Sequence, residues 1–171
     1  MDPRILIVDD DRDYLELSRN RLNACGFKAV DALEDPRQAA ELFESNVTYD
    51  VAVIDVGMPE IDGQALLEII KKTSPATECI MVTAMNDART SVNCLRKGAY
   101  DYLVKPVSED EVIFAVKRAL ERKRLLDILH VEKSRCVWRS RRHDAEGYEI
   151  AGCLLLGQPP WIRNVGSFRR H

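Results

Sequence analysis

Four short apolar segments of this chain each end in side chains that could act together on one ligand. Acidic residues follow two of the segments, a hydroxyl follows the third and an ammonium follows the fourth. Carboxylates are ligands for a hard cation such as Mg²⁺, and lysine and hydroxyl groups hold phosphoryl oxygens. The set therefore suits a cation and a phosphoryl group bound side by side. Its members are Asp9, Asp10 and Asp11 after residues 5–8, Asp55 after 51–54, Thr83 after 79–82, and Lys105 after 102–104.

The chemistry of each side chain suggests a role for it. Asp55 is the candidate nucleophile, because a carboxylate can carry a phosphoryl group as an acyl phosphate. Asp10 and Asp55, with Asp9 in support, supply oxygen ligands for Mg²⁺. Lys105 would pair with a phosphoryl oxygen as a point charge, and Thr83 would donate a hydrogen bond to one. Taken singly, each residue is better explained as a cap or a loop residue, so only their joint occurrence favours a site.

Alternating strands and helices would bring these segments to one edge of a sheet. Short strands separated by helices predict right-handed crossovers and a doubly wound parallel sheet. Ligands bind such sheets at the carboxyl ends of the strands. The predicted strands are 4–8, 28–31, 51–55, 79–83 and 102–105, and the predicted helices lie near 12–24, 36–45, 63–73, 87–97 and 109–130.

Local signals mark several helix boundaries. Gly26 and Gly98 stand where a glycine commonly follows a helix end. Ser108 and Glu111 have the spacing of a capping box at the start of the last helix. The prominence of valine and isoleucine predicts strands that are covered on both faces. Because residues 112 to about 133 contain neither glycine nor proline, the last helix is expected to continue as a linker.

Composition narrows the class of protein. The chain has 171 residues, of which 46% are hydrophobic and 31% charged, as in ordinary globular domains. It has no apolar stretch of the about 18 residues that a membrane helix needs. Its five cysteines are widely spaced and form no C-x-x-C pair. A reducing, cytoplasmic location is therefore expected, without disulfides or a zinc site.

The charge is divided unequally along the chain. Residues 1–116 hold 12 Lys and Arg against 22 Asp and Glu, a net charge of -10. Residues 117–171 hold 13 against 6, a net charge of +7. A basic tail can bind nucleic acid, but a solvated linker helix that touches an acidic partner explains it more simply.

The motifs together resemble the receiver domain of bacterial two-component response regulators, over residues 4 to about 122. The resemblance implies a flavodoxin-like fold, with a five-stranded parallel sheet in the order 2-1-3-4-5 and five helices, the last extended into a linker. It also implies that Asp55 takes a phosphoryl group from the phosphohistidine of a sensor histidine kinase. The matching segments are 5–11 (ILIVDDD), 50–63 with Asp55 and Met58-Pro59, 82–84 (VTA), and 98–106 (GAYDYLVKP).

The same resemblance implies a cofactor and a switch. Mg²⁺ would be held by Asp10, Asp55 and the backbone carbonyl of Gly57, with Asp9 acting partly through water. The bond between Lys105 and Pro106 would be cis. Thr83 would move toward the acyl phosphate and Tyr102 would turn inward behind it. The protein would then be a phosphoacceptor regulator, with no enzymatic activity beyond its own phosphorylation and dephosphorylation.

Phosphorylation would act through protein contacts. The resemblance implies that the surface of helix 87–97, strand 102–105 and helix 109–122 changes its contacts. A homodimer through this face or through the linker helix is expected, in the service of transcriptional regulation. Contact with DNA would need an output domain that this chain lacks, and no contact with a membrane is expected.

The predicted division of the chain is a receiver domain at 1–122 followed by a linker helix and basic tail at 123–171. Residues 149–163 loosely resemble the beginning of the ATPase domain of activators that work with an alternative sigma factor. The tail could thus be the start of a truncated output domain. The chain has no G-x-x-x-x-G-K-[ST] loop, so it is not itself a P-loop ATPase.

Three other functions stay open. A phosphohydrolase would use Asp9 and Asp11 in an Asp-x-Asp motif, with Thr83 and Lys105 in support, but it leaves the Asp55 motif unexplained. A scaffold with the same fold that is never phosphorylated would usually have lost one of the site residues, and all are present here. Binding of DNA by the basic tail is the weakest of the three.

Overall fold

The computed structural model describes residues 2–84 and 88–143. A five-stranded parallel sheet has the order β2-β1-β3-β4-β5, which confirms the predicted order. The sheet lies in the first compact unit of the chain, Met1–Leu129. Its strands are β1 (Arg4–Val8), β2 (Ala29–Leu33), β3 (Val51–Asp55), β4 (Glu78–Thr83) and β5 (Asp101–Val104), and the helices are α1 (Arg12–Ala24), α2 (Pro36–Glu44), α3 (Gly63–Thr73), α4 (Ala88–Arg96) and α5 (Glu109–His143).

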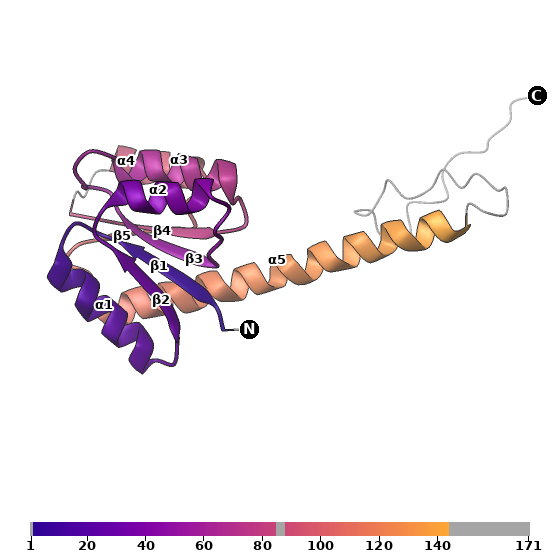
Figure 1. Ribbon diagram of the computed structural model, residues 1–171, viewed down its shortest axis with the longest axis horizontal. Coiled ribbons are helices and arrows are strands. Elements are labelled where there is room, and N and C mark those ends of the chain that lie inside the picture. The colour runs from indigo at the N-terminus through magenta and orange to yellow at the C-terminus, as the bar shows by residue number, and fades with distance from the viewer. Residues whose placement is uncertain (1, 85–87, 144–171) are drawn as a thin grey trace, which may run out of the picture. The chain divides into compact units, whose positions relative to one another are not determined.

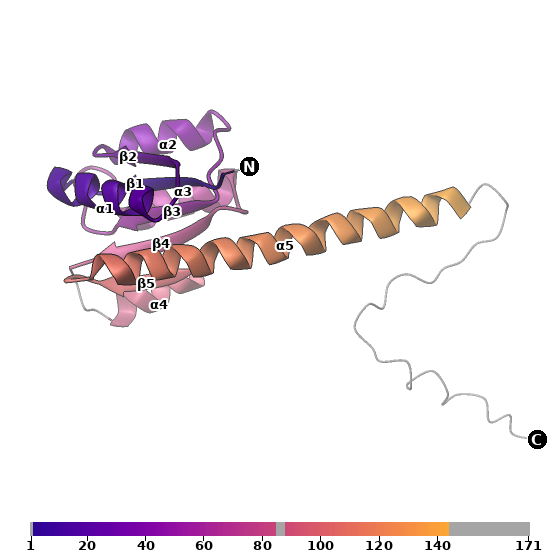
Figure 2. The same ribbon diagram turned by 90° about the horizontal axis from the view of Figure 1, so that it is seen from below.

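Helices cover both faces of the sheet, with α1 and α5 on one face and α2, α3 and α4 on the other (Figures 1 and 2). Alternate strand residues therefore enter two separate cores. Leu6 and Ile54 pack with α2 and α3, whereas Ile5 and Val53 pack with α1 and α5. The three central strands are buried almost throughout, as predicted for strands that are covered on both faces.

The edge strands differ from the prediction. Residues of β2 are partly exposed, and Asp31 is exposed, because β2 has a neighbour on one side only. β5, the other edge strand, is also partly exposed. The burial predicted from valine and isoleucine content holds only for strands paired on both sides. This weaker pattern also explains why the predicted limits of β2 and β5, 28–31 and 102–105, are displaced by one or two residues.

The helix signals in the sequence are confirmed. Gly26 and Gly98 follow α1 and α4 with φ of 97° and 98°, a region that L side chains rarely adopt. The backbone N–H of Ser108 donates to Glu111 at 2.8 Å, and that of Glu111 donates to the Ser108 hydroxyl at 3.3 Å. This capping box starts α5, which continues well beyond the predicted residue 130.

Among the helices that the structure describes, none combines the length and the apolar character that a membrane crossing requires.

Replacement of Tyr49 by phenylalanine should remove an alkaline loss of stability. Burial, then the hydrogen bond to Asp31 at 2.9 Å, raises the pKa of Tyr49 to about 12. A free phenol has a pKa of about 10, so the native state holds this proton more tightly than the unfolded state does. The free energy of unfolding should therefore decrease as the pH rises from about 10 to about 12, and decrease less in Tyr49→Phe. Denaturant unfolding across this range measures the difference, and equal slopes in both proteins would contradict the assignment.

Candidate functional site

The Lys105 ammonium contacts two buried carboxylates at the carboxyl ends of the strands. Its Nζ is 2.8 Å from Oδ2 of Asp9 and 2.9 Å from Oδ1 of Asp55. These side chains follow or end β1, β3 and β5, which the parallel register brings to one edge. Asp9 is 1% exposed and Asp55 is 5% exposed. The predicted grouping of these three residues is therefore what the fold produces.

Backbone amides hold the other oxygens of the two carboxylates. The N–H of Asp11 donates to Oδ1 of Asp9 at 2.9 Å, and the N–H of Gly57 donates to Oδ2 of Asp55 at 2.7 Å. Each of the four oxygens thus has a hydrogen-bond or ion-pair partner. The two carboxylates share a single ammonium, so the group carries a net negative charge.

The pKa values of the site reflect burial opposed by pairing. Burial raises the pKa of Asp9, while the hydrogen bonds from Lys105 and from the Asp11 amide work against the increase. Burial alone would lower the pKa of Lys105, but its hydrogen bonds to Asp55 and Asp9 outweigh this and raise it. Lys105 is therefore a fixed positive charge at any physiological pH.

Thr83 and Tyr102 lie on the neighbouring strands of the same region. Thr83 ends β4, is 1% exposed and stands beside Val104 in the sheet register. Tyr102 is half-buried in β5, beside Met81, and packs against the core formed with α2 and α3. The peptide bond between Lys105 and Pro106 is cis, as the resemblance implied.

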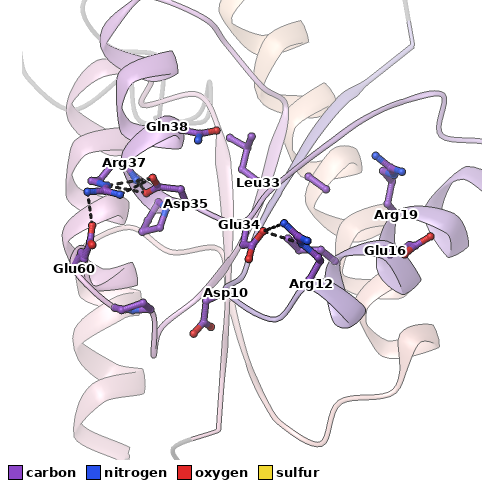
Figure 3. A pocket seen from close by; sticks show the side chains of 14 residues that line it. Asp10, Arg12, Glu16, Arg19, Leu33, Glu34, Asp35, Arg37, Gln38 and Glu60 are labelled. Atoms are coloured by element: carbon purple, nitrogen blue, oxygen red, sulfur yellow. Dashed lines mark hydrogen bonds and ion pairs between the residues drawn. The ribbon is translucent and has the colours of Figure 1, made fainter.

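Asp10 differs from Asp9 and Asp55 in that its side chain is exposed. It lines an open cleft of about 860 Å³, together with residues of α1, α2 and the loops beside them (Figure 3). Ion pairs from Arg12 to Glu34, at 3.0 Å, and from Arg37 to Glu60, at 2.7 Å, lie along this cleft. The first residue of the acidic run thus points into the site and the second lies at a polar surface.

The donor set suits a hard cation. Asp9, Asp10, Asp55 and the Gly57 carbonyl offer oxygen ligands only, and the excess negative charge favours a divalent ion. Among the side chains that the structure describes, however, no three acidic, histidine or cysteine residues form a group that could hold a metal ion. The ammonium of Lys105 instead contacts two of the predicted ligands. The assignment of metal ligands stays a prediction.

Asp11 has a structural position at the start of α1. Its Oδ1 accepts from the N–H of Asp13 at 3.0 Å and from that of Tyr14 at 3.2 Å, so Asp11 is the N-cap of this helix. The phosphohydrolase alternative needs Asp11 as a catalytic group, and the cap explains the residue without that role.

The sequence interpretation missed two residues of the site. The ring of Tyr14 lies beside the Lys105 ammonium, with 4.8 Å from Nζ to the ring centroid. Gly63 approaches the end of β3 so closely that a Cβ would overlap the Asp55 carbonyl oxygen and lie 2.9 Å from Cα of Val56. The available signals were an aromatic one helical turn after the first acidic run and a glycine at the start of the helix that follows Asp55.

Comparison with known proteins places this geometry in a family. The model of the response regulator receiver domain matches residues 5–117. The transcriptional regulatory protein ZraR of Escherichia coli (strain K12) is 35% identical over 123 residues, which are 72% of this chain and 27% of ZraR. The C4-dicarboxylate transport transcriptional regulatory protein DctD of Rhizobium meliloti (strain 1021) is 28% identical over 169 residues, or 99% of this chain and 34% of DctD. The chain thus spans about a third or less of each relative.

A solved structure agrees with the sequence matches. The beryllofluoride-activated dimer of the NtrC4 receiver domain has a TM-score of 0.65 and 31% identity, covering 70% of this chain and 98% of that one. Receiver domains are regulators of two-component phosphorelays rather than enzymes of the usual kind, and they generally bind Mg²⁺ at the phosphorylation site. The strand order, the edge carboxylates and the matched sequence agree: the chain belongs to the response regulator receiver domain family.

Proposed function

We propose that Asp55 is the phosphoacceptor of this receiver and takes its phosphoryl group from the phosphohistidine of a sensor histidine kinase. The supporting observation is the place of Asp55 at the carboxyl end of the central strand, with Lys105 on one oxygen and the Gly57 amide on the other. Both contacts hold the carboxylate in place, and a carboxylate oxygen can act as the nucleophile. The family match supports the reaction class.

Phosphoryl transfer at this site forms one bond and breaks one. An oxygen of Asp55 attacks phosphorus, the bond from phosphorus to the donor nitrogen breaks, and the imidazole leaves with the electron pair. After the transfer, the Lys105 ammonium pairs with a phosphoryl oxygen in place of the Asp55 carboxylate oxygen. Thr83 lies at the end of the adjacent strand, within the same region, and donates its hydroxyl hydrogen to a second phosphoryl oxygen.

Mg²⁺ is the proposed cofactor, held by Asp9, Asp10, Asp55 and the carbonyl of Gly57. When bound, the ion neutralises the negative charge that the carboxylates and the phosphoryl group bring together. The buried position of Asp9 and Asp55 limits the approach of water to the reacting oxygen.

The proposed output is a change of protein contacts. Thr83 and Tyr102 would carry the signal from the phosphoryl group to the face of α4, β5 and α5, a population shift between two pre-existing states. Exposed apolar side chains already stand on this face. The NtrC4 receiver forms a dimer when activated, and we propose a homodimer here through this face or the linker helix. The apolar side chains of the face are Val92, Leu95, Val104 and Phe114.

Transcriptional regulation is the proposed purpose, because ZraR and DctD are transcriptional regulatory proteins. DNA would be contacted only through an output domain, for which residues 1–122 supply the switch and 123–171 the linker and tail. Cys25, Cys79 and Cys94 are free thiols, which accords with the cytoplasmic location that we also propose.

Intact-mass measurement after incubation with acetyl phosphate and Mg²⁺ tests the proposal. The full chain should gain one phosphoryl group, lose the gain when EDTA is present, and release the group to hydroxylamine, which cleaves acyl phosphates. Absence of any gain would favour the scaffold, and a gain that resists hydroxylamine would exclude an aspartyl phosphate.

A further inference from the structure

Three groups from separate segments enclose the ammonium of Lys105. The carboxylates of Asp9 and Asp55 contact it, and the ring of Tyr14 lies beside it with 4.8 Å between Nζ and the ring centroid. The Lys105 side chain is 26% exposed, so water reaches only part of it. Among the described residues, Lys105 alone contacts both buried carboxylates. The Tyr14 ring is the third group that contacts its ammonium.

The position of Tyr14 depends on its backbone and its ring. Asp11 accepts a hydrogen bond from the Tyr14 amide at the first turn of α1, which fixes where the side chain leaves the helix. The hydroxyl is buried and has no hydrogen-bond partner among the residues that the structure describes. Burial raises the pKa of Tyr14, and the polar side chain of Ser18, one turn later, partly opposes the increase. The face of the ring is therefore the part of Tyr14 that contacts the site.

An aromatic ring beside an ammonium has two physical effects. The negative face of the ring attracts the cation. The ring also displaces water, so the attraction between the ammonium and each carboxylate is less screened. Both effects hold the charge in one place, whereas a lysine stem with four rotatable carbons would otherwise spread it over many positions.

We propose that Tyr14 is a positioning residue, whose ring holds the Lys105 ammonium where it meets the incoming phosphoryl group. The inference rests on the proposed function, in which Asp55 accepts that group. Because Lys105 must act as soon as the donor arrives, a prepositioned ammonium lowers the cost of ordering the transition state. Loss of the ring would leave the charge present but poorly placed.

A space-filling role for Tyr14 in the packing of α1 makes a different prediction. Tyr14→Phe keeps the ring and removes only the unpaired hydroxyl, whereas Tyr14→Leu keeps an apolar side chain and removes the ring face. If Tyr14 only fills space, both variants should alter stability and neither should affect Lys105 in particular.

Phosphorylation kinetics of the full chain with acetyl phosphate and Mg²⁺ separate the two roles. The rate constant of Tyr14→Leu should fall by roughly two- to tenfold, the range that corresponds to one cation–π contact. Tyr14→Phe should restore most of the rate. In a Lys105→Met background, Tyr14→Leu should cause no further loss, because the partner of the ring is already absent. Equal losses with and without Lys105 would overturn the proposal.

A control aromatic residue lies at the amino ends of the strands, away from the site at their carboxyl ends. Tyr100, just before β5, has the Arg122 guanidinium over its ring at 5.4 Å from the centroid. Tyr100→Leu removes a comparable contact and should leave the phosphorylation rate unchanged. A loss as large as that of Tyr14→Leu would show that any lost aromatic slows the reaction, which contradicts a specific role for Tyr14.

Nitrogen NMR of the lysine ammonium gives a readout that needs no phosphorylation. In the wild type and in Tyr14→Phe, the Lys105 ammonium should exchange its hydrogens slowly enough to give a signal, and in Tyr14→Leu the signal should be lost. If the signal behaves so but the wild type takes up no phosphoryl group, the proposed function fails and the positioning of Lys105 stands. If the wild type is phosphorylated and the signal is unchanged in Tyr14→Leu, the positioning role is wrong.

Discussion

Replacement of Asp55 by asparagine is expected to abolish phosphorylation of this protein, with a rate at least roughly 100-fold lower, because an amide oxygen is a far weaker nucleophile than a carboxylate. The side chain keeps its shape, so the Gly57 amide can still donate to the oxygen that it now contacts at 2.7 Å. Lys105 keeps its pairing with Asp9. Intact-mass measurement over time with acetyl phosphate and Mg²⁺ gives the rate.

Two matched variants in the first acidic run control for the loss of a carboxylate. Asp11→Asn should be phosphorylated like the wild type, because asparagine is as good an N-cap as aspartate. Asp9→Asn should be phosphorylated more slowly, but still measurably, since it removes one of the two carboxylate partners of Lys105 and a proposed ligand of Mg²⁺. Uptake by Asp55→Asn together with none in Asp9→Asn would move the nucleophile to β1 and favour the phosphohydrolase.

Replacement of Gly63 by alanine is expected to lower the free energy of unfolding by about 3–5 kcal/mol, among the larger effects that single substitutions have. The added Cβ would overlap the backbone carbonyl oxygen of Asp55 and lie 2.9 Å from Cα of Val56. Both obstacles are backbone atoms of a buried segment, so neither can move as a side-chain end can. Relief requires α3 to shift away from the end of β3, which would also displace Asp55.

Gly57→Ala is the matched control for this steric effect. A Cβ on Gly57 would lie 3.4 Å from Oδ2 of Asp55, an ordinary contact, although it is near the same carboxylate. Denaturant unfolding should show a small change for Gly57→Ala and a large one for Gly63→Ala. Phosphorylation at a temperature where both are folded should be slower in Gly63→Ala. Equal stabilities of the two variants would mean that α3 moves without cost.

Much of this molecule can be read from local patterns. Apolar runs of four or five residues, each followed by a helix, predict the parallel sheet. The helix returns the chain to the start of the next strand, and such crossovers are right-handed. Since all strands of a parallel sheet end at one edge, the order of residues alone predicts that Asp9, Asp55 and Lys105 lie together. The cap at Ser108 and the turn at Gly26 are equally local, since each depends on residues within a few positions.

The arrangement inside the site depends on contacts between distant segments. Adjacent residues of one acidic run, Asp9 and Asp10, diverge because a strand end sends successive side chains to opposite directions. That Lys105 joins two carboxylates, and that Tyr14 lies beside it, follows from how α1 and the strand ends pack. Gly63 is needed because α3 closes on the end of β3. Residue types along a chain indicate which groups meet, but their distances are set by the packing of side chains across the fold, which no local pattern encodes.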